Sequence, residues 1–442
     1  MKNPQILLSV DELPDKWYNI QADLPEPLPP PQDPDGKRME FLGKTMIKTC
    51  LEQEMSKEGW IDIPEGIREL YLQAGRPRPL IRAFKLEQFL GLPNSIELYY
   101  KREDLSPSGS HKVNTALPQA YYAKKDNNIG LTTETGAGQW GSALAYAASQ
   151  VDLDLVVFWV GHVFDLKPER LEYMQNLGAT VHRSPSTMTE FGRKIKGENE
   201  KHPGSLGIAI SEGLEYAEKT VGYKYSLGSV LNHVLIHQSI IGLETQKQLE
   251  MIDKKPTAII GCLGGGSNFS GIALPFAGQV LRGEIDRDSI EFIPAQSEAA
   301  ANLSGVYRYD YGDVAEHTPM LKMRTLGHKS EMEPIYADGL RYHAAAPIVS
   351  FLADKEYINL KPRWYPQNEI EIMEASKIFF QKEGWRIAPE SSYAVKAMME
   401  RALEAKRAKE GAVIVANISG HGWLDLEYNS KLLDVKVPPK YA

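Results

Sequence analysis

Cysteine is scarce in this chain: among its 442 residues only Cys50 and Cys262 occur. Two cysteines do not suggest a disulfide framework, so the sequence favours a reducing, cytoplasmic compartment. No apolar run is long enough to span a membrane, and the first residues lack the long apolar core and small-residue cleavage site of a signal peptide. We therefore expect neither membrane insertion nor secretion.

Positive charge is not in excess, and zinc-binding motifs are missing. The net charge is −8, which argues against a broad nucleic-acid surface. The ten histidines include no HExxH pattern, and we interpret His233 and His237, four residues apart, as packing residues rather than metal ligands. The hydrophobic content of 42% and charged content of 24% are ordinary for a globular protein with two or three domains.

Short apolar runs alternate with helical periods along most of the chain, and this predicts an α/β fold with mostly parallel open sheets flanked by helices. The proline-dense stretch 23–37 should be extended, either as a wrapping arm or as a disordered leader. Residues 39–75 should be mostly helical, and 300–345 should be irregular and form loops. Strands are predicted at 96–104, 128–135, 153–161, 180–184, 257–262, 290–298 and 412–419, and helices at 112 to about 125, 142–150, 168–178 and 396–411, the last capped by Gly411.

Polar and glycine-rich segments follow several of these strands, at the edge where ligands bind in open α/β sheets. The motif GGGSN, residues 264–268, follows a buried strand and opens a helix. Bare backbone N–H groups, the Ser267 hydroxyl and a helix start would form a cradle for an anion such as a phosphate group. The alternative interpretation is a tight turn, and the absence of a following Gly-Lys-Ser/Thr excludes a Walker loop.

A second glycine loop, GAGQWG at 136–141, has the GxGxxG spacing of a dinucleotide-binding oxidoreductase. That fold needs an acid at the end of the next strand, where this chain has Gly161 and His162. Glu134 also lies just before the loop and would point a carboxylate at a pyrophosphate. The loop is better suited to a smaller anion, such as a carboxylate.

Lys112 lies at the start of a predicted helix, where the partial positive charge of the helix N-terminus disfavours an ammonium group. A neutral, partly desolvated lysine suits Schiff-base chemistry. A phosphate cradle, a reactive lysine and the carboxylic acid of Glu134 together meet the requirements of pyridoxal phosphate, whose ring is an electron sink. The alternative is that Lys112 is a solvated surface residue.

The motifs HKVN, ETGAGQWG, GGGSN, PESS and SGHG occur in this order, and together they resemble the tryptophan synthase β chain family, most closely its second type with an N-terminal extension. The resemblance covers nearly the whole chain. It implies a fold type II pyridoxal-phosphate lyase that condenses L-serine with indole through an aminoacrylate to give L-tryptophan.

The resemblance also implies roles for individual residues. Lys112 would form the Schiff base and move the α-proton, and Glu134 would be the acid/base group at the β-carbon. The cofactor would contact His111, Asn114, Gly264, Gly265, Gly266, Ser267, Asn268, Glu390 and, at its pyridine nitrogen, Ser419. The carboxylate of the substrate would contact Thr135, Gly136, Ala137, Gly138 and Gln139.

The architecture implied by the resemblance has the cofactor in a cleft between two α/β domains. Its parts would be an N-terminal extension at 1–77, a segment at 78–110 that packs with the C-terminal domain, an N-terminal domain at 111–240 with a mobile region at about 127–220, and a C-terminal domain at 241–442. The resemblance further implies a homodimer and a monovalent cation held by backbone carbonyls. It also implies an α chain as a partner, but the N-terminal extension and the departures described next argue against that partner.

Three positions depart from the usual family pattern: Trp140 replaces a histidine, His421 an arginine, and Arg341 an aspartate that approaches the serine hydroxyl. Arginine binds anions bidentately, so we hypothesise that Arg341 recognises the phosphate of O-phosphoserine. The alternative is that Arg341 pairs with a local acid.

Other functions remain open from the sequence. A serine or threonine dehydratase would form the same aminoacrylate and hydrolyse it. A dinucleotide-dependent oxidoreductase lacks its acid, and a non-catalytic subunit of the same fold would not need Lys112 and Glu134.

Overall fold

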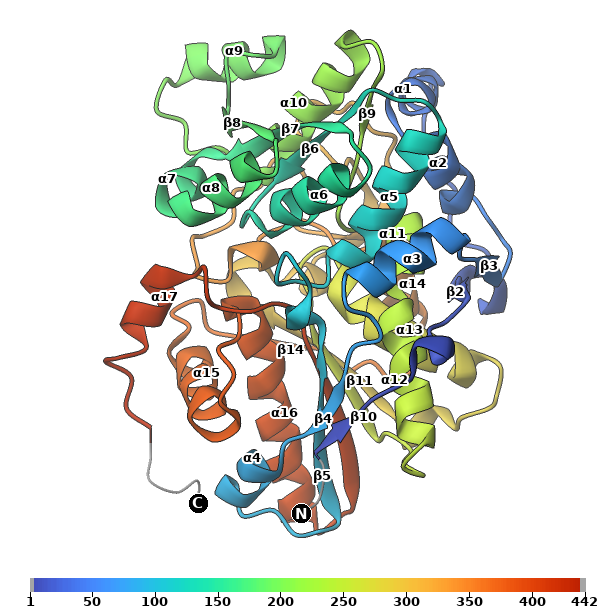
Figure 1. The fold of residues 1–442 in the computed structure, drawn as a ribbon, viewed down its shortest axis with the longest axis vertical. Coiled ribbons are helices and arrows are strands. Elements are labelled where there is room, and N and C mark those ends of the chain that lie inside the picture. Colours follow the sequence, from blue (N-terminus) through green and yellow to red (C-terminus); the bar gives the residue numbers. More distant parts are fainter. Residues whose placement is uncertain (1–3, 438–442) are drawn as a thin grey trace.

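The computed structural model describes residues 4–437, and two open sheets organise it (Figure 1). The first has seven strands in the order β1-β4-β5-β15-β10-β11-β14, and the second has four in the order β8-β7-β6-β9. The strands of the first are β1 (Gln5–Ile6), β4 (Leu80–Arg82), β5 (Ile96–Arg102), β15 (Ala412–Ile418), β10 (Ala258–Cys262), β11 (Glu291–Ser297) and β14 (Arg363–Tyr365); those of the second are β8 (Thr180–Ser184), β7 (Asp154–Val160), β6 (Gly130–Thr135) and β9 (Tyr223–Tyr225).

Both sheets are mostly parallel. All pairings in the four-stranded sheet are parallel, and in the seven-stranded sheet only β1 with β4 and β4 with β5 are antiparallel. Alternate residues of β10 enter different cores: Ile259 packs in the layer of α13, and Ile260 packs in the layer of α16. Because both faces are covered, the strand reads as a continuous apolar run.

Helices flank both sheets, so the predicted α/β class is confirmed. Around the four-stranded sheet lie α5 (Val113–Lys125), α6 (Gln139–Gln150), α7 (Gly161–Leu166), α8 (Pro168–Asn176), α9 (Glu190–Glu198) and α10 (Leu206–Lys219). The remaining helices are α1 (Lys37–Thr45), α2 (Lys48–Glu54), α3 (Glu65–Gln73), α4 (Phe84–Phe89), α11 (Asn232–Gln238), α12 (Ile240–Glu250), α13 (Ser267–Leu281), α14 (Pro347–Lys355), α15 (Ile370–Glu383), α16 (Pro389–Ala408) and α17 (Leu426–Lys431).

Two local predictions were wrong. The region 300–345 is not only loops, because β12 (Val306–Asp310) and β13 (Leu321–Thr325) form an antiparallel pair. The helix predicted at 396–411 is α16, which begins at Pro389; Lys409, with φ 59°, follows it in the left-handed conformation, so Gly411 is not its cap. The predicted domain boundaries stay a prediction, although β4 and β5 do pair within the seven-stranded sheet.

The N-terminal segment is a wrapping arm. Its strand β2 (Lys16–Tyr18) pairs with β3 (Trp60–Asp62), and Trp17 is fully buried against Tyr71 and His237. The proline-rich stretch then crosses to the C-terminal half, where Gln32 forms a backbone bridge with Met320.

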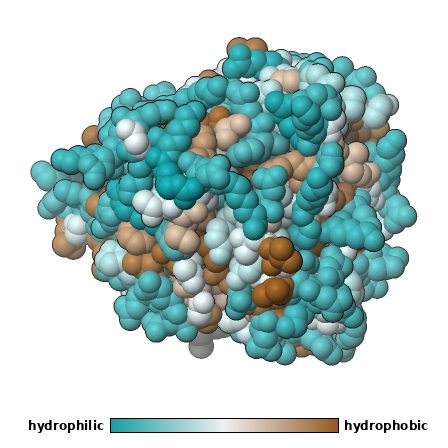
Figure 2. All heavy atoms as spheres, turned by 90° about the horizontal axis from the view of Figure 1, so that it is seen from above, coloured by the Kyte–Doolittle hydropathy of each residue, from teal (hydrophilic) through white to brown (hydrophobic). Residues whose placement is uncertain are grey.

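The outer surface is mainly hydrophilic on the side of the four-stranded sheet, with small separate apolar spots (Figure 2). Isolated apolar side chains of this kind are normal on a protein surface. Among residues 4–437, no helix combines the length and the apolar character that a membrane crossing requires.

We expect Trp17→Ala to lower the free energy of unfolding by about 3–5 kcal/mol, because it leaves a cavity under the arm. Trp60→Ala is the matched control, since this tryptophan lies in the paired strand but is 50% exposed; its cost should stay below about 1 kcal/mol. Urea denaturation followed by circular dichroism measures the free energy of unfolding of both variants. Equal losses of this free energy would show that the arm does not contribute to the core.

Candidate active site

A cavity lies where the carboxyl ends of strands from both sheets meet. Glu134 and Thr135 end β6, Cys262 ends β10, and Ser419 follows β15. Most of the sequence-predicted residues line it: His111, Lys112, Glu134, Thr135, Gly136, Ala137, Gln139, Gly264, Gly265, Gly266, Ser267, Asn268, Arg341, Glu390 and Ser419.

Lys112 immediately precedes α5, and its half-buried side chain lines the cavity. Its Nζ donates a hydrogen bond to the carbonyl oxygen of Gly228 at 3.2 Å. Desolvation lowers the pKa of Lys112 to about 8, although the carboxylates of Glu134 and Glu390 act in the opposite direction. A substantial fraction of the amine is therefore neutral near physiological pH, as a nucleophile requires.

Glu134 lies at the end of β6 and is only 4% exposed. Its Oε2 accepts hydrogen bonds from the hydroxyls of Tyr225 and, at 3.3 Å, Thr133. Burial raises the pKa of Glu134 to about 7, against the opposing effects of the Tyr225 bond and of Lys112. A carboxyl group with such a pKa can both donate and accept a proton near neutral pH.

The GGGSN loop packs so tightly that side chains are excluded from it. A Cβ on Gly264 would lie 2.6 Å from the carbonyl oxygen of Gly339, and one on Gly265 would lie 2.8 Å from Ser229 Oγ. Gly266 has φ 120°, a conformation that favours glycine, and α13 begins at the next residue. The loop therefore exposes backbone at the positive end of a fifteen-residue helix.

His111 connects this loop to the neighbourhood of Lys112. Its Nε2 lies 3.1 Å from Ser267 Oγ. Burial, with a smaller contribution from Lys112, lowers the pKa of His111 to about 3, so the ring is neutral. A neutral imidazole can orient the Ser267 hydroxyl without adding a charge to the cradle.

A hydroxyl and a thiol also line the cavity. Ser419 Oγ lies 2.9 Å from Ser391 Oγ and 3.5 Å from Cys262 Sγ. Burial raises the pKa of Cys262 to about 12, so the thiol is neutral. Glu390 accepts hydrogen bonds from Gln139 Nε2 at 3.1 Å and from the N–H of Gly339 at 2.9 Å, which ties the GAGQ loop to the turn that precedes Arg341.

Arg341 lines the cavity but already has local partners. Its Nη1 donates to Asp338 Oδ1 at 3.2 Å and lies 2.7 Å from His162 Nε2, and its Nη2 donates to the carbonyl oxygen of Met332 at 2.6 Å. The pairing with a local acid, the alternative raised from the sequence, is thus present in the structure.

Comparisons with known proteins agree with a pyridoxal-phosphate site in this cavity. A family model described as pyridoxal-phosphate-dependent enzyme matches residues 71–420. Tryptophan synthase beta chain 2 of Methanothermobacter thermautotrophicus is 49% identical over 435 residues, covering 98% of this chain and 99% of that one. The protein of the same name from Pyrococcus furiosus is 47% identical over 437 residues, covering 97% and 95%.

The chain belongs to the tryptophan synthase β chain family of pyridoxal-phosphate-dependent enzymes.

Solved structures show the same fold at much lower identity. Threonine deaminase isoform 2 from Solanum lycopersicum superimposes with a TM-score of 0.60 at 18% identity, covering 95% of this chain and 96% of that one. A fungal L-serine ammonia-lyase from Rhizomucor miehei gives 0.58 at 16% identity, covering 81% and 98%. Together these findings confirm the resemblance, the fold class and pyridoxal phosphate as the cofactor of the family.

The residues present fit pyridoxal phosphate. The bare N–H groups of the GGGSN loop and the Ser267 hydroxyl are donors suited to its phosphate, and a side chain at Gly264 or Gly265 would clash with Gly339 or Ser229 behind the loop. The Lys112 amine can attach its aldehyde, and the Ser419 hydroxyl can meet its ring nitrogen.

Two predicted site residues do not line the cavity. Gly138, with φ 90°, forms the turn before α6, where a Cβ would meet Trp159 at 2.7 Å. Asn114 lies in the first turn of α5, and its side-chain amide bonds with Arg76, Glu103 and Gln238. The structure therefore places neither Gly138 nor the side chain of Asn114 at the wall of the cavity.

Sequence reasoning missed several wall residues because no motif marks them: Leu206, Gly228, Ser229, Cys262, Asp338, Gly339, Leu340 and Tyr342. Of the departures from the family pattern, Trp140 lines the cavity and its Nε1 donates to Thr133 Oγ1 at 2.6 Å. His421 instead packs over Gly109, where a Cβ would lie 1.9 Å from the ring.

We expect the stability of this site to depend on the protonation of Glu134. Its pKa is 4.5 when unperturbed and about 7 in the fold, so the folded chain holds the proton more tightly and loses stability as pH rises through that range. Glu134→Gln removes this penalty and should gain roughly 3 kcal/mol over wild type between pH 4.5 and 7. Urea unfolding of the cofactor-free proteins at several pH values measures the difference, and a difference independent of pH would contradict the assignment.

Proposed function

We propose that this chain makes L-tryptophan from indole and L-serine or O-phospho-L-serine, by a β-replacement in which the β-carbon loses its oxygen and bonds to a carbon of indole. The observation that carries the proposal is that the amine of Lys112 and the carboxyl of Glu134 open onto one cavity with pKa values of about 8 and about 7. The tryptophan synthase β chains that match nearly the full length of this chain support the same reaction.

Binding and orientation come from the two glycine loops. Gly264, Gly265, Gly266, Ser267 and Asn268 would hold the cofactor's phosphate, and the loop from Thr135 to Gln139 would hold the substrate's carboxylate. When bound, pyridoxal phosphate supplies an electron sink for the α-carbon of the amino acid. The remaining chemistry is proton transfer by the chain's own residues.

Lys112 and Glu134 would divide the proton transfers. The neutral amine of Lys112 would take the proton from the α-carbon, and protonated Glu134 would give its proton to the oxygen that leaves the β-carbon. Glu134, then a carboxylate, would accept the proton that indole releases on forming the new bond. Lys112 would return its proton to the α-carbon, so that serine and indole give tryptophan and water and both residues return to their starting states.

Ser419 would set the reaction type. Its neighbours Ser391 and Cys262 are neutral hydroxyl and thiol groups, so no carboxylate at this point requires a protonated pyridine nitrogen. An unprotonated ring is a weaker sink, which favours loss of the β-substituent over racemisation or transamination.

The alternative is a serine or threonine dehydratase, in which water replaces indole. The structures of a threonine deaminase and an L-serine ammonia-lyase share the fold, but at 18% and 16% identity they bear on the fold alone. Chromatography for tryptophan and for the keto acid, with and without indole, separates the two reactions.

Lys112→Ala should lower kcat for tryptophan formation by at least about 10²-fold, because it removes the group that moves the α-proton. Lys124→Ala, on the same helix but with its ammonium bonded to a carbonyl oxygen at the surface, is the matched control. Full activity in the Lys112 variant, or keto acid as the main product with indole present, would refute the proposal.

The choice of donor follows from the charges around Arg341. Lys167 Nζ lies 3.4 Å from Asp338 and 3.2 Å from Asp425, and Arg170 pairs with Asp425 at 3.2 Å. Arg341 and Lys167 both pair with Asp338, so cations outnumber anions at this carboxylate. This surplus favours a phosphorylated donor.

We therefore expect a higher kcat/KM with O-phospho-L-serine than with L-serine. Arg341→Gln should lower kcat/KM for the phosphorylated donor by about 10- to 100-fold, the value of a hydrogen bond to a charged group, and alter that for L-serine little. Initial rates with each donor decide the matter, and an equal loss with both donors would assign Arg341 a structural role through Asp338.

The family assignment also supports a homodimer, and an α chain remains a candidate partner; a monovalent cation and a cytoplasmic location are likewise inferred from the family alone. Light scattering after size exclusion, with and without an added α chain, tests the assembly. An unchanged mass on adding an α chain would remove that partner.

A further inference from the structure

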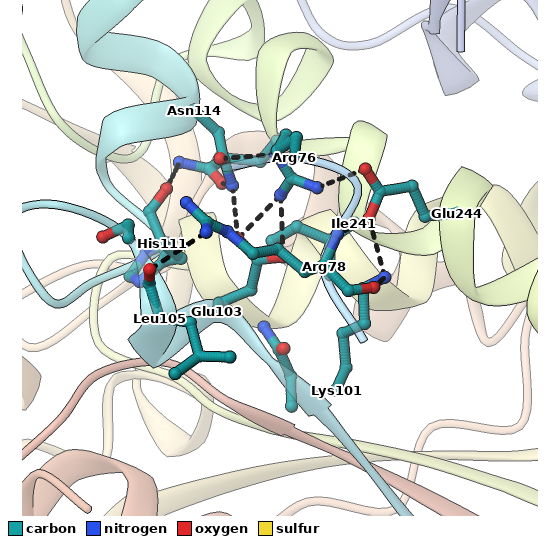
Figure 3. A network of polar contacts seen from close by, with 12 residues as sticks. Arg76, Arg78, Lys101, Glu103, Leu105, His111, Asn114, Ile241 and Glu244 are labelled. Atoms are coloured by element: carbon teal, nitrogen blue, oxygen red, sulfur yellow. Dashed lines mark hydrogen bonds and ion pairs between the residues drawn. The ribbon is translucent and has the colours of Figure 1, made fainter. Parts of the chain in front are cut away.

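A buried network of charged side chains lies behind the first turn of α5, on the side away from the cavity (Figure 3). Arg76 pairs with Glu103 at 2.7 Å and with Glu244 at 2.7 Å, and Lys101 pairs with Glu244 at 2.7 Å. The side chains of these four residues are at most 1% exposed. Arg78 completes the network through backbone carbonyl oxygens, including that of Leu105 at 2.9 Å.

Stability alone does not account for this network. Three cations are buried with two carboxylates. Removing each ion from water costs several kcal/mol, and this cost is about as large as the free energy gained when the ions pair. Apolar residues of similar volume often serve stability as well or better. What such a network provides is a fixed geometry, because every member is held by several directed bonds.

Asn114 is the point at which the network reaches the helix that carries Lys112. Its Oδ1 accepts from Arg76 Nε at 3.0 Å, and its Nδ2 donates to Glu103 Oε2 at 2.9 Å and to Gln238 Oε1 at 3.1 Å. Three of the four hydrogen bonds that an amide side chain can make are thus formed. The side chain is 2% exposed, so these bonds have no competition from water.

The backbone on both sides of Lys112 is tied to the same framework. The carbonyl oxygen of His111 accepts from Gln238 Nε2 at 3.1 Å, and the carbonyl oxygen of Asn114 accepts from the Tyr71 hydroxyl at 2.6 Å. Lys112 lies at the end of the helix, where the backbone N–H groups have no partners within the helix and the chain frays most easily. Bonds to a rigid framework suppress such fraying.

We propose that Asn114 is a positioning residue through which the buried network of Arg76, Glu103 and Glu244 fixes the Lys112 amine relative to the phosphate cradle. Fixing this distance matters because a displacement of about 1 Å in a reacting group can cost about 10²-fold in rate. The proposal rests on the proposed role of Lys112, and it gives a function to a residue whose side chain does not reach the cavity.

The test compares Asn114→Ala with a control from a neighbouring buried ion pair. Arg102 and Asp104 pair at 2.7 Å with 1% and 5% exposure, and none of their hydrogen bonds within residues 4–437 reaches residues 111–114. Asp104→Asn should therefore destabilise the fold without releasing the first turn of α5. Hydrogen exchange of the amides at 113–116 in the cofactor-free proteins is the readout.

We expect exchange at 113–116 to accelerate at least about tenfold in Asn114→Ala and to stay unchanged in Asp104→Asn at matched distance from the melting temperature. Affinity for pyridoxal phosphate should fall about tenfold in the first variant only, and its kcat should fall more than its KM rises. If Asn114→Ala does not fold, Gln238→Ala, which cuts the ties to Asn114 Nδ2 and to the His111 carbonyl oxygen but leaves those from Arg76 and Glu103, should show a smaller effect of the same kind.

Unchanged exchange in Asn114→Ala and Gln238→Ala, or equal effects in the control, would overturn the positioning role even if the chain makes tryptophan. Failure of the wild-type chain to make tryptophan would instead overturn the proposed function and leave the exchange result standing.

Discussion

The burial of the Lys112 amine is the constraint on which the rest of the site depends. An ammonium ion without water around it is costly, so the group becomes partly neutral near pH 8. The same enclosure raises the pKa of Glu134 to about 7. Desolvation thus shifts both pKa values toward neutral pH, so that Lys112 can act as a base and Glu134 as an acid in the same reaction.

The fold supplies this enclosure by bringing two parallel sheets together at their carboxyl ends. Each sheet contributes one glycine loop, GAGQ from the smaller and GGGSN from the larger, and Lys112, at the start of α5, lines the cavity with both. Three side chains at the cavity wall carry no charge: the neutral imidazole of His111, the thiol of Cys262 and the hydroxyl of Ser419. The ionisable side chains that line the same cavity include Lys112, Glu134 and Arg341.

Much of this could be predicted from sequence because the signals are local. Period-two and period-3.6 patterns marked the strands and helices, and the glycine loops need no long-range information. The β12–β13 pair was missed because short, half-exposed strands resemble loops, and α16 ends on a left-handed Lys409, which no propensity indicates. Ser229 and Tyr225 enter the site only through tertiary packing, and the direction of the Asn114 side chain depends on partners distant in sequence.

The most direct test of this account is the pKa of Lys112 itself. The cofactor-free protein would be treated with a limiting amount of an amine-reactive reagent across a pH series, and labelling of Lys112 followed by mass spectrometry. The account predicts a midpoint near pH 8. A midpoint near 10.5, the value of an unperturbed lysine, would show that water reaches the amine and would contradict the central claim.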